Sequence, residues 1–333
     1  DLTEKVLARP VAAVVDGQCE TLPEVLRVAR SAGLVTILLG ATNDHVGPQL
    51  IRAAADVSSE QLAGMLHSAI SLAPVLRGLH ADASRATHSA DELDEEMRIA
   101  SKLQQDFLPR RLPALGDVRF AVLYRPASWV SGDIYDVARL DEQHIGFYVA
   151  DAVGHGMPAA LLTMFIKEAM QTKRISGHSY ELIPPHETLA ALNADLCSQR
   201  LSMCEFCTAI YAILNCQTGR MTISRAGHPA PIVRDASGET DRIELPGPLL
   251  GVMDDATYES HHAELERGQR MILYSDGLED AVCGKGATNL QSLLDLLGPL
   301  GELSRQELIM GLSDRLEALD CEDDVTLLLV ERE

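Results

Sequence analysis

The chain has few cationic side chains for its length. Its 333 residues include 28 Lys and Arg against 49 Asp and Glu, which gives a formal net charge of −21 at pH 7. A surface with this charge repels a phosphate backbone and an anionic membrane surface. We therefore expect no nucleic-acid partner and no membrane partner.

Long apolar runs are also missing. None approaches the roughly 20 residues that a helix needs to cross a bilayer, and residues 1–5 lack the apolar segment of a signal peptide. We therefore expect a cytoplasmic protein. The first residue is Asp1 and not Met, which suggests that the native start lies upstream. The 46% of hydrophobic residues predict a globular protein with room for two domains.

Cysteine is scarce and gives no sign of a disulfide framework or a zinc site. There are seven cysteines, an odd number. Cys204 and Cys207 form one Cys-x-x-Cys, but a second pair or a nearby His-x-His is missing, and on a strand the two side chains would face opposite sides. We expect reduced, buried thiols, in agreement with a reducing compartment.

Residues 1–76 predict a small α/β region. Two apolar runs have the composition of strands, and three segments have helical patterns: strands at 11–16 and 35–39, helices at 22–32, around 47–55 and at 59–73. Strands that alternate with helices predict a parallel sheet with helices on its faces.

This first region resembles, in part, a response-regulator receiver domain. Asp16 ends one strand as the receiver phosphoacceptor does, and Thr42 follows the next strand like its hydroxyl partner. No strand before Asp16 carries an acidic pair, and residues 55–60 stand where the third strand and its lysine belong. We expect a partial or degenerate receiver that acts as an interaction module, with Asp16 as its candidate phosphoacceptor.

Residues 77–108 predict a helical, coiled-coil-like linker. Apolar and small residues follow a four-three spacing from Leu79 to Phe107, and acidic residues such as Glu92 lie off that line. The seam is rich in alanine, so it would hold a dimer only modestly. Two interpretations stay open: a homodimer through the linker, or one long amphipathic helix packed on a neighbouring domain.

Residues 109–333 predict an α+β domain. Pro109 and Pro113 end the preceding helix. Short β-type runs follow at 118–124, 145–150, 206–214, 221–226, 230–234, 270–275 and 325–331, and helical patterns interrupt them at 158–173, 186–201, 289–297 and 304–319. Consecutive strands with helices inserted in blocks predict layers built on antiparallel sheets.

Four aspartates of this domain occur in short acidic motifs at strand ends or turns: Asp133, Asp151, Asp276 and Asp323. Hard divalent cations prefer carboxylate, carbonyl and water oxygens, and the glycines in three of these motifs let backbone approach an ion. If the four converge, they can hold two ions that acidify a water and orient a phosphoryl group. Without cations, such a cluster would repel itself and take up protons. Each aspartate alone has the simpler interpretation of a turn or cap residue.

The domain resembles the bacterial PP2C-type (PPM, SpoIIE-like) serine/threonine phosphatases. Seven motifs occur in the order of that family, at 103–109, 131–136, 150–160, 225–231, 249–251, 273–281 and 323–326. The resemblance implies a PP2C-like antiparallel β-sandwich flanked by helices, with two Mn²⁺ or Mg²⁺ ions at one edge. It also implies a phosphoric monoester hydrolase, in which a water activated by the two metals attacks phosphorus.

The resemblance assigns a role to each ligand position. Asp151 is similar to the bridging ligand at the centre of the reaction. The second ion would take the carbonyl of Ala152 and the carboxylate of Asp133, and the first ion would take Asp276 and Asp323.

Other positions complete the family pattern. Asp324 stands where many relatives carry Asn, and Val153 where a small polar residue is usual; neither change removes a ligand. His155, four residues after Asp151, is the candidate catalytic acid for the leaving serine or threonine oxygen, with a structural turn histidine as the alternative. We expect His228 to buttress a strand turn.

The family also implies a substrate. Relatives with this architecture dephosphorylate small STAS proteins, the antagonists of anti-sigma factors, so we expect a phosphorylated STAS-type protein in a partner-switching pathway. The alternative is a non-catalytic signalling adaptor of the same fold, which binds a partner under control of the receiver-like region. The four retained carboxylates favour the enzyme. The linker leads into Gln104 and Gln105, so we expect it to regulate the domain from there.

Overall fold

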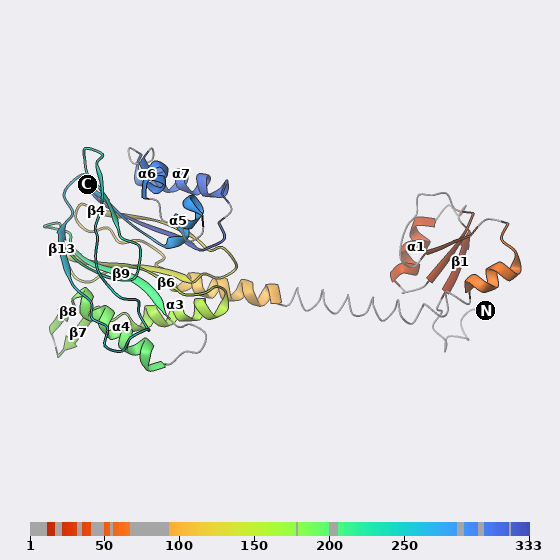
Figure 1. The fold of residues 1–333 in the computed structure, drawn as a ribbon, viewed down its shortest axis with the longest axis horizontal. Helices are drawn as coiled ribbons and strands as arrows, with labels where there is room; N and C mark the ends of the chain where they lie inside the picture. The colour runs from red at the N-terminus through yellow and green to blue at the C-terminus, as the bar shows by residue number, and fades with distance from the viewer. Residues whose placement is uncertain are drawn as a thin grey trace. The chain divides into compact units, whose positions relative to one another are not determined.

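The computed structural model describes residues 12–16, 22–31, 35–40, 50–53, 56–66, 93–177, 179–199, 206–284, 290–298, 303–319 and 321–333. The chain divides into two compact units, Asp1–Glu95 and Glu96–Glu333 (Figure 1). Residues 93–107 are helical, and most of this helix belongs to the second unit. Residues 77–92 of the predicted linker lie outside the described residues.

The first unit contains a three-stranded parallel sheet. Its elements are β1 (Ala12–Asp16), α1 (Leu22–Ser31), β2 (Val35–Leu39) and β3 (Leu50–Ala53), with a further helical segment at 59–66. The strand order is β1-β2-β3. The helix α1 makes the crossover that parallel strands require, and Ile37 and Leu38 of the central strand are fully buried. This agrees with the predicted parallel layer, while the likeness to a receiver stays a prediction.

One prediction for this unit is wrong. Residues 50–53 were expected within a helix around 47–55, but they form β3 and pair in parallel with β2, Thr36 opposite Leu50. A short apolar run fits either structure when judged by its periodicity. Pairing with the second edge of β2 provides hydrogen-bond partners for the backbone groups of β2 and β3. This pairing favours the strand over the helix.

The second unit is built on two five-stranded antiparallel sheets. The first has the order β13-β10-β9-β6-β5, and the second has the order β12-β11-β14-β15-β4. The strands are β4 (Val118–Arg125), β5 (Asp133–Arg139), β6 (His144–Ala152), β9 (Cys207–Asn215), β10 (Arg220–Ala226), β11 (Ile232–Arg234), β12 (Thr240–Arg242), β13 (His261–Glu264), β14 (Arg270–Tyr274) and β15 (Val325–Arg332).

The inner faces of the two sheets form the central core. Alternate residues of each strand point inward, such as Phe147 and Val149 of β6 and Leu328 of β15, all fully buried. The rings of Phe120 in the second sheet and Phe147 in the first pack edge to face, with centroids 5.5 Å apart. Interdigitated side chains of this kind hold two packed sheets together.

Helices cover both outer faces (Figure 1). On the first sheet lie α3 (Met157–Ala169) and α4 (Pro185–Gln199); on the second lie α5 (Asp276–Cys283), α6 (Leu290–Leu297) and α7 (Arg305–Glu317). Because both faces of each sheet are buried, central strands such as β6 and β15 are almost continuously apolar. This layering confirms the predicted antiparallel β-sandwich flanked by helices.

The sequence did not indicate several shorter elements. The helix predicted at 158–173 ends at Ala169, and the hairpin of β7 (Lys173–Ser176) and β8 (Ser179–Leu182) follows it. The edge strand β5 was not predicted, because Asp133, Asp136 and Arg139 interrupt its apolar pattern. Among the helices in the described ranges, none is long and apolar enough to cross a membrane.

Candidate metal and active site

Strand pairing brings Asp133 and Asp151 together. Asp133 begins β5, Asp151 is the penultimate residue of β6, and the two are direct partners across the antiparallel pair. Side chains of directly opposed residues have Cβ atoms roughly 5 Å apart. The sequence could not show this, because the 17 positions between them give no register until both strands are known.

Asp276 and Asp323 come from the second sheet. Asp276 is the first residue of α5, directly after β14, and Asp323 lies just before β15. The two strands are neighbours, and Tyr274 at the end of β14 pairs with Leu327 near the start of β15. The four predicted aspartates therefore lie at one end of the sandwich.

Two glycines allow the close approach of these segments. A Cβ on Gly277 would collide with the carbonyl oxygen of Asp324, and a Cβ on Gly132 would lie 2.9 Å from the carbonyl oxygen of Ala152. Each glycine thus lets backbone pass where a side chain would separate the acidic segments. This explains why glycine adjoins Asp133 and Asp276 in their motifs.

Burial and the proximity of other carboxylates raise the pKa values of Asp133 and Asp151 in this cluster. Asp133 is 1% exposed, and burial together with the charge of Asp151 raises its pKa well above the usual range. Burial is also the main reason why the pKa of Asp151 rises to about 8. The negative charges of Asp276, Asp323 and Asp324 add to that rise. Protons or cations must neutralise such a group.

Asp133 is anchored to the opposite sheet. The hydroxyl of Ser275, between β14 and α5, donates a hydrogen bond of 2.6 Å to Asp133 Oδ2. The same hydroxyl oxygen accepts a bond of 2.9 Å from the backbone N–H of Thr326 in β15. Ser275 is fully buried and thus joins the acidic ends of both sheets.

Asp324 has a structural role that the sequence did not reveal. Its Oδ1 accepts a hydrogen bond of 2.7 Å from the N–H of Ala127, and its Oδ2 accepts one of 2.6 Å from the N–H of Gly132. The residue is only 7% exposed. Both oxygens are engaged in holding the loop between β4 and β5, so Asp324 is a positioning residue and not a ligand candidate.

The fit of a metal follows from the donor set. In the part of the chain that the structure describes, no three His, Cys, Asp or Glu side chains are grouped closely enough to form a ready metal site. The aspartates share one end of the sandwich without closing around a single point. Their chemistry fits a hard divalent cation, because the donors are carboxylates and backbone carbonyls that repel one another when left without a counter-charge.

The two singled-out histidines differ in environment. His155 is exposed, in the loop between β6 and α3, and both neighbours, Gly154 and Gly156, have positive φ values of 97° and 76°. His228 is 1% exposed, and its Nδ1 lies 2.7 Å from the hydroxyl of Thr208. Burial lowers the pKa of His228 to about 3, so it stays neutral and fits the expected buttressing role.

Gln104 is the residue whose role differs most from its sequence pattern. It is 3% exposed; its Nε2 donates to the carbonyl of Ser131 at 2.7 Å and to the hydroxyl of Thr163 at 3.0 Å. Its Oε1 accepts from the N–H of Ser131 at 2.9 Å. Gln104 fits the four-three spacing of the predicted linker, but it faces the second unit, where both ends of its buried amide find partners.

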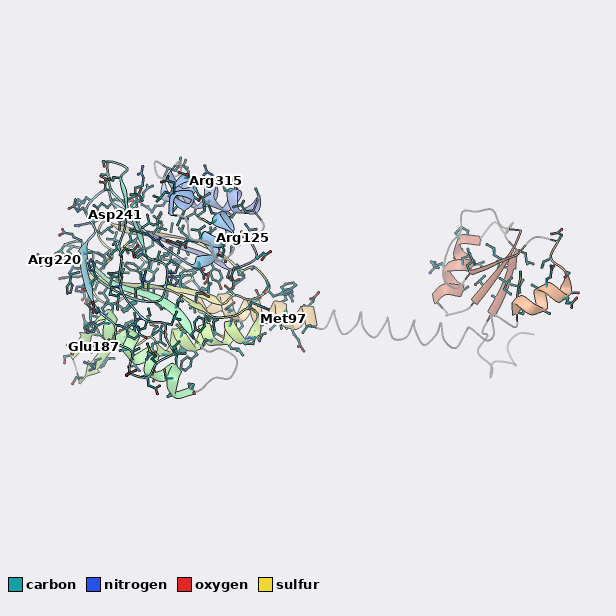
Figure 2. The ribbon with its side chains drawn as sticks, viewed as in Figure 1. Met97, Arg125, Glu187, Arg220, Asp241 and Arg315 are labelled. Carbon is teal, nitrogen blue, oxygen red and sulfur yellow. The ribbon has the colours of Figure 1, made fainter. Side chains whose placement is uncertain are left out.

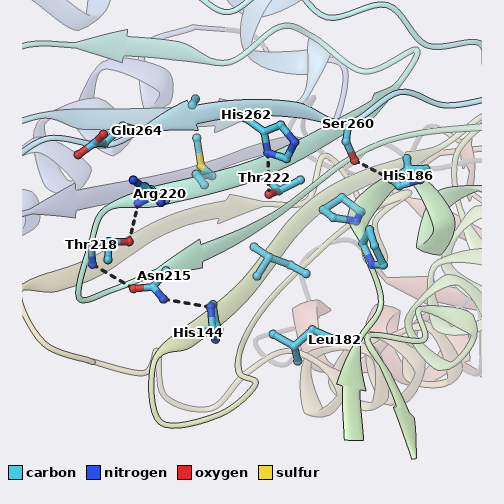
Figure 3. A pocket seen from close by; sticks show the side chains of 15 residues that line it. His144, Leu182, His186, Asn215, Thr218, Arg220, Thr222, Ser260, His262 and Glu264 are labelled. Atoms are coloured by element: carbon cyan, nitrogen blue, oxygen red, sulfur yellow. Dashed lines mark hydrogen bonds between the residues drawn. The ribbon is translucent and has the colours of Figure 1, made fainter.

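A groove of about 1030 Å³ lies elsewhere on the first sheet (Figure 3). It is lined by His144 at the start of β6 and Asn215 at the end of β9. In the same groove, His186 Nδ1 lies 2.6 Å from the hydroxyl oxygen of Ser260. Asp151 is the seventh residue after His144 in β6, a distance of roughly 23 Å along a strand. The groove is therefore at the opposite end from the aspartates and is not the candidate active site. Asp16 belongs to the other unit, where it ends β1.

Solved structures share this architecture. The SiaA-PP2C domain of Pseudomonas aeruginosa matches with a TM-score of 0.63 and 20% identity, over 74% of this chain and 99% of that one. The RsbU and RsbW domains of Rv1364c from Mycobacterium tuberculosis match with a TM-score of 0.56 and 22% identity, over 67% of this chain and 62% of that one. The second unit thus has the fold of the PP2C phosphatases.

The sequence comparisons define the family. The family model of Stage II sporulation protein E (SpoIIE) matches residues 141–333, more than half of the chain, so the chain belongs to the SpoIIE family. The phosphoserine phosphatase RsbU of Bacillus subtilis (strain 168) is 29% identical over 245 residues, 72% of this chain and 71% of RsbU. The phosphoserine phosphatase RsbP of the same organism is 29% identical over 71% of this chain and 57% of RsbP. By family and fold, the chain is a protein phosphatase of the PP2C class.

Proposed function

We propose that the chain is a metal-dependent protein-serine/threonine phosphatase that removes phosphate from a STAS-type anti-sigma-factor antagonist in a partner-switching pathway. The observation that carries the proposal is the pairing of Asp133 with Asp151 at the end of the sandwich where Asp276 and Asp323 also lie. The names of RsbU and RsbP as phosphoserine phosphatases support the same reaction class.

Two Mn²⁺ or Mg²⁺ ions, when bound, would supply Lewis-acid activation of water and neutralise the phosphoryl oxygens. Asp151 would take the bridging position, because it pairs with Asp133 in the first sheet, and after burial the charges of Asp276 and Asp323 raise its pKa. Asp133 and the carbonyl of Ala152 would serve one ion, and Asp276 and Asp323 the other. The burial of Asp133 and its bond from Ser275 fix the geometry of the set.

The leaving group needs a proton when the bond from phosphorus to the serine or threonine oxygen breaks. His155 is exposed and follows Asp151 by four residues, so it borders the site from the side of α3. A protonated imidazole can donate this proton at its ring nitrogen. We assign His155 as the catalytic acid.

Regulation would act through the helix at 93–107. Gln104 forms two hydrogen bonds with the backbone of Ser131, two residues before Asp133. A shift of the helix would therefore move the start of β5. Leu93, Ile99 and Leu103 are 55%, 58% and 53% exposed on this helix, which supports a homodimer formed through the linker. Phosphorylation of the first unit at Asp16, its candidate phosphoacceptor, would favour or disfavour this dimer contact.

The test is Mn²⁺-dependent release of phosphate from p-nitrophenyl phosphate and from a phosphoserine peptide. Asp151→Asn and Asp276→Asn should each abolish release, because each removes a charge from the ligand set. His262→Gln, an exposed histidine in the distant groove, is the matched control and should retain activity. A chain that binds phosphoprotein but never releases phosphate would instead support the adaptor.

A further inference from the structure

Trp129 leaves a large apolar surface in water. It is the single tryptophan of the chain and is 47% exposed. Other large aromatic residues, such as Phe147 and Tyr211, are fully buried. Tyr180 is similarly exposed, but the ammonium group of Lys173 lies 5.2 Å from its ring centroid. Within the described ranges, Trp129 has no stacking or cation partner, so its exposure costs free energy until a partner covers it.

The loop that carries Trp129 has a fixed backbone. It begins after Arg125, the last residue of β4 (Figure 2). The N–H groups of Ala127 and Gly132, on either side of Trp129, both donate to the buried carboxylate of Asp324. Val130, directly after Trp129, is only 2% exposed. A side chain presented by a fixed backbone loses little conformational freedom on binding.

Trp129 is also close to the aspartates. The N–H of Ala127 lies 2.7 Å from Asp324, and Trp129 follows Ala127 by two residues. Each residue spans at most about 3.6 Å, so the Cα of Trp129 lies within roughly 10 Å of that carboxylate. A phosphoserine held at the aspartates would place residues roughly two to four positions away over the indole.

We propose that Trp129 is a docking residue for the protein substrate and receives an apolar side chain that stands roughly two to four positions from the phosphoserine. The inference rests on the proposed phosphatase function. The occupant is the substrate and not a second copy of the chain, because a copy seated on Trp129 would cover the nearby aspartates. Tryptophan is also enriched among residues that dominate binding energy.

Two phosphoserine peptides test the inference with the full chain and Mn²⁺. They are identical except that the positions roughly two to four residues on either side of the phosphoserine are leucine in one and glycine in the other. We expect the wild type to favour the leucine peptide by about tenfold in kcat/KM, as one apolar contact allows. W129S should reduce this ratio to near unity. I175S, which removes a 77% exposed isoleucine from the hairpin of β7 and β8, should keep it.

Fluorescence gives a second readout, since all tryptophan emission comes from Trp129. With the phosphoserine replaced by a non-hydrolysable phosphonate, the leucine peptide should shift the emission of the wild type in Mn²⁺ to shorter wavelength, and the matching glycine peptide should not. A wild type that does not distinguish the peptides, or W129S with an unchanged ratio, would overturn the inference. So would emission that shifts with protein concentration alone, because a second copy would then cover Trp129. If no phosphate is released from either peptide or from p-nitrophenyl phosphate, the proposed function fails, and the emission shift still decides the docking role.

Discussion

Gln104 holds both backbone polar groups of Ser131, accepting from its N–H at 2.9 Å and donating to its carbonyl at 2.7 Å. Ser131 is fully buried and in turn accepts a bond of 3.0 Å at its hydroxyl from the N–H of Asp133. One side chain on the connecting helix is thus two hydrogen bonds away from the candidate ligand Asp133. We propose that this hydrogen-bonded path couples the helix to the acidic site.

Replacement of Gln104 by alanine tests this coupling. Q104A leaves the buried N–H and carbonyl of Ser131 without partners, which should destabilise the second unit by about 1–3 kcal/mol. Phosphatase activity should fall with it, because the start of β5 loses its support. Q105A removes the neighbouring amide, which is exposed, and should change neither. Urea unfolding and phosphate release measure the two effects; equal behaviour of the two variants would contradict the coupling.

The hydrogen bonds of Asp324 predict that its replacement affects the stability of the loop between β4 and β5 and not the binding of metal. In the wild type, each oxygen of the Asp324 carboxylate accepts a hydrogen bond, one from the N–H of Ala127 and one from the N–H of Gly132. The amide of D324N has only one accepting oxygen for these two donors. We expect a loss of about 1–3 kcal/mol in the free energy of unfolding, since one buried donor is left unpaired. D323N should instead weaken Mn²⁺ binding. Calorimetric titration that shows equal weakening in both variants would refute the positioning role of Asp324.

Cation removal should lower the stability of the folded chain. A ligand that binds only the folded state stabilises it by about 2.7 kcal/mol at a free concentration of 100 times its Kd. Thermal unfolding with Mn²⁺ and with a chelator measures this gain. The gain should vanish in D151N, which lacks the carboxylate that we propose as the bridging ligand. A chelator without effect on the wild type would contradict a cation site in the folded protein.

His228 predicts sensitivity to acid. Burial lowers its pKa in the folded state to about 3 from the ordinary 6.5, so between these values the unfolded chain binds a proton that the folded chain does not. The stabilising contribution is complete above pH 6.5 and is lost as pH falls toward about 3. The slope is at most about 1.4 kcal/mol per pH unit for one group.

Urea unfolding across this pH range, in the wild type and in H228Q, isolates the contribution. The variant should have a shallower pH dependence by about one bound proton. H262Q removes an exposed histidine of β13 and serves as the control. Identical slopes in the wild type and in H228Q would show that His228 does not stay neutral in the fold.

Periodicity predicted the central strands and the flanking helices; buried strands such as β6 and β15 have long apolar runs. The short acidic motifs indicated the four aspartates as candidate ligands. Other features depend on tertiary contacts that no local pattern contains. Strand β3 depends on pairing with β2, and the role of Asp324 depends on N–H groups nearly 200 residues away. Gln104 fits a helical seam by spacing alone, and only the fold shows that it faces Ser131.

Calorimetric titration of Mn²⁺ into the full chain tests the central claim most directly, with phosphate release from a phosphoserine peptide measured on the same sample. The account predicts uptake of two ions by the wild type together with turnover, and loss of both uptake and turnover in D151N. Phosphate release without cation uptake, or full uptake and turnover in D151N, would contradict it.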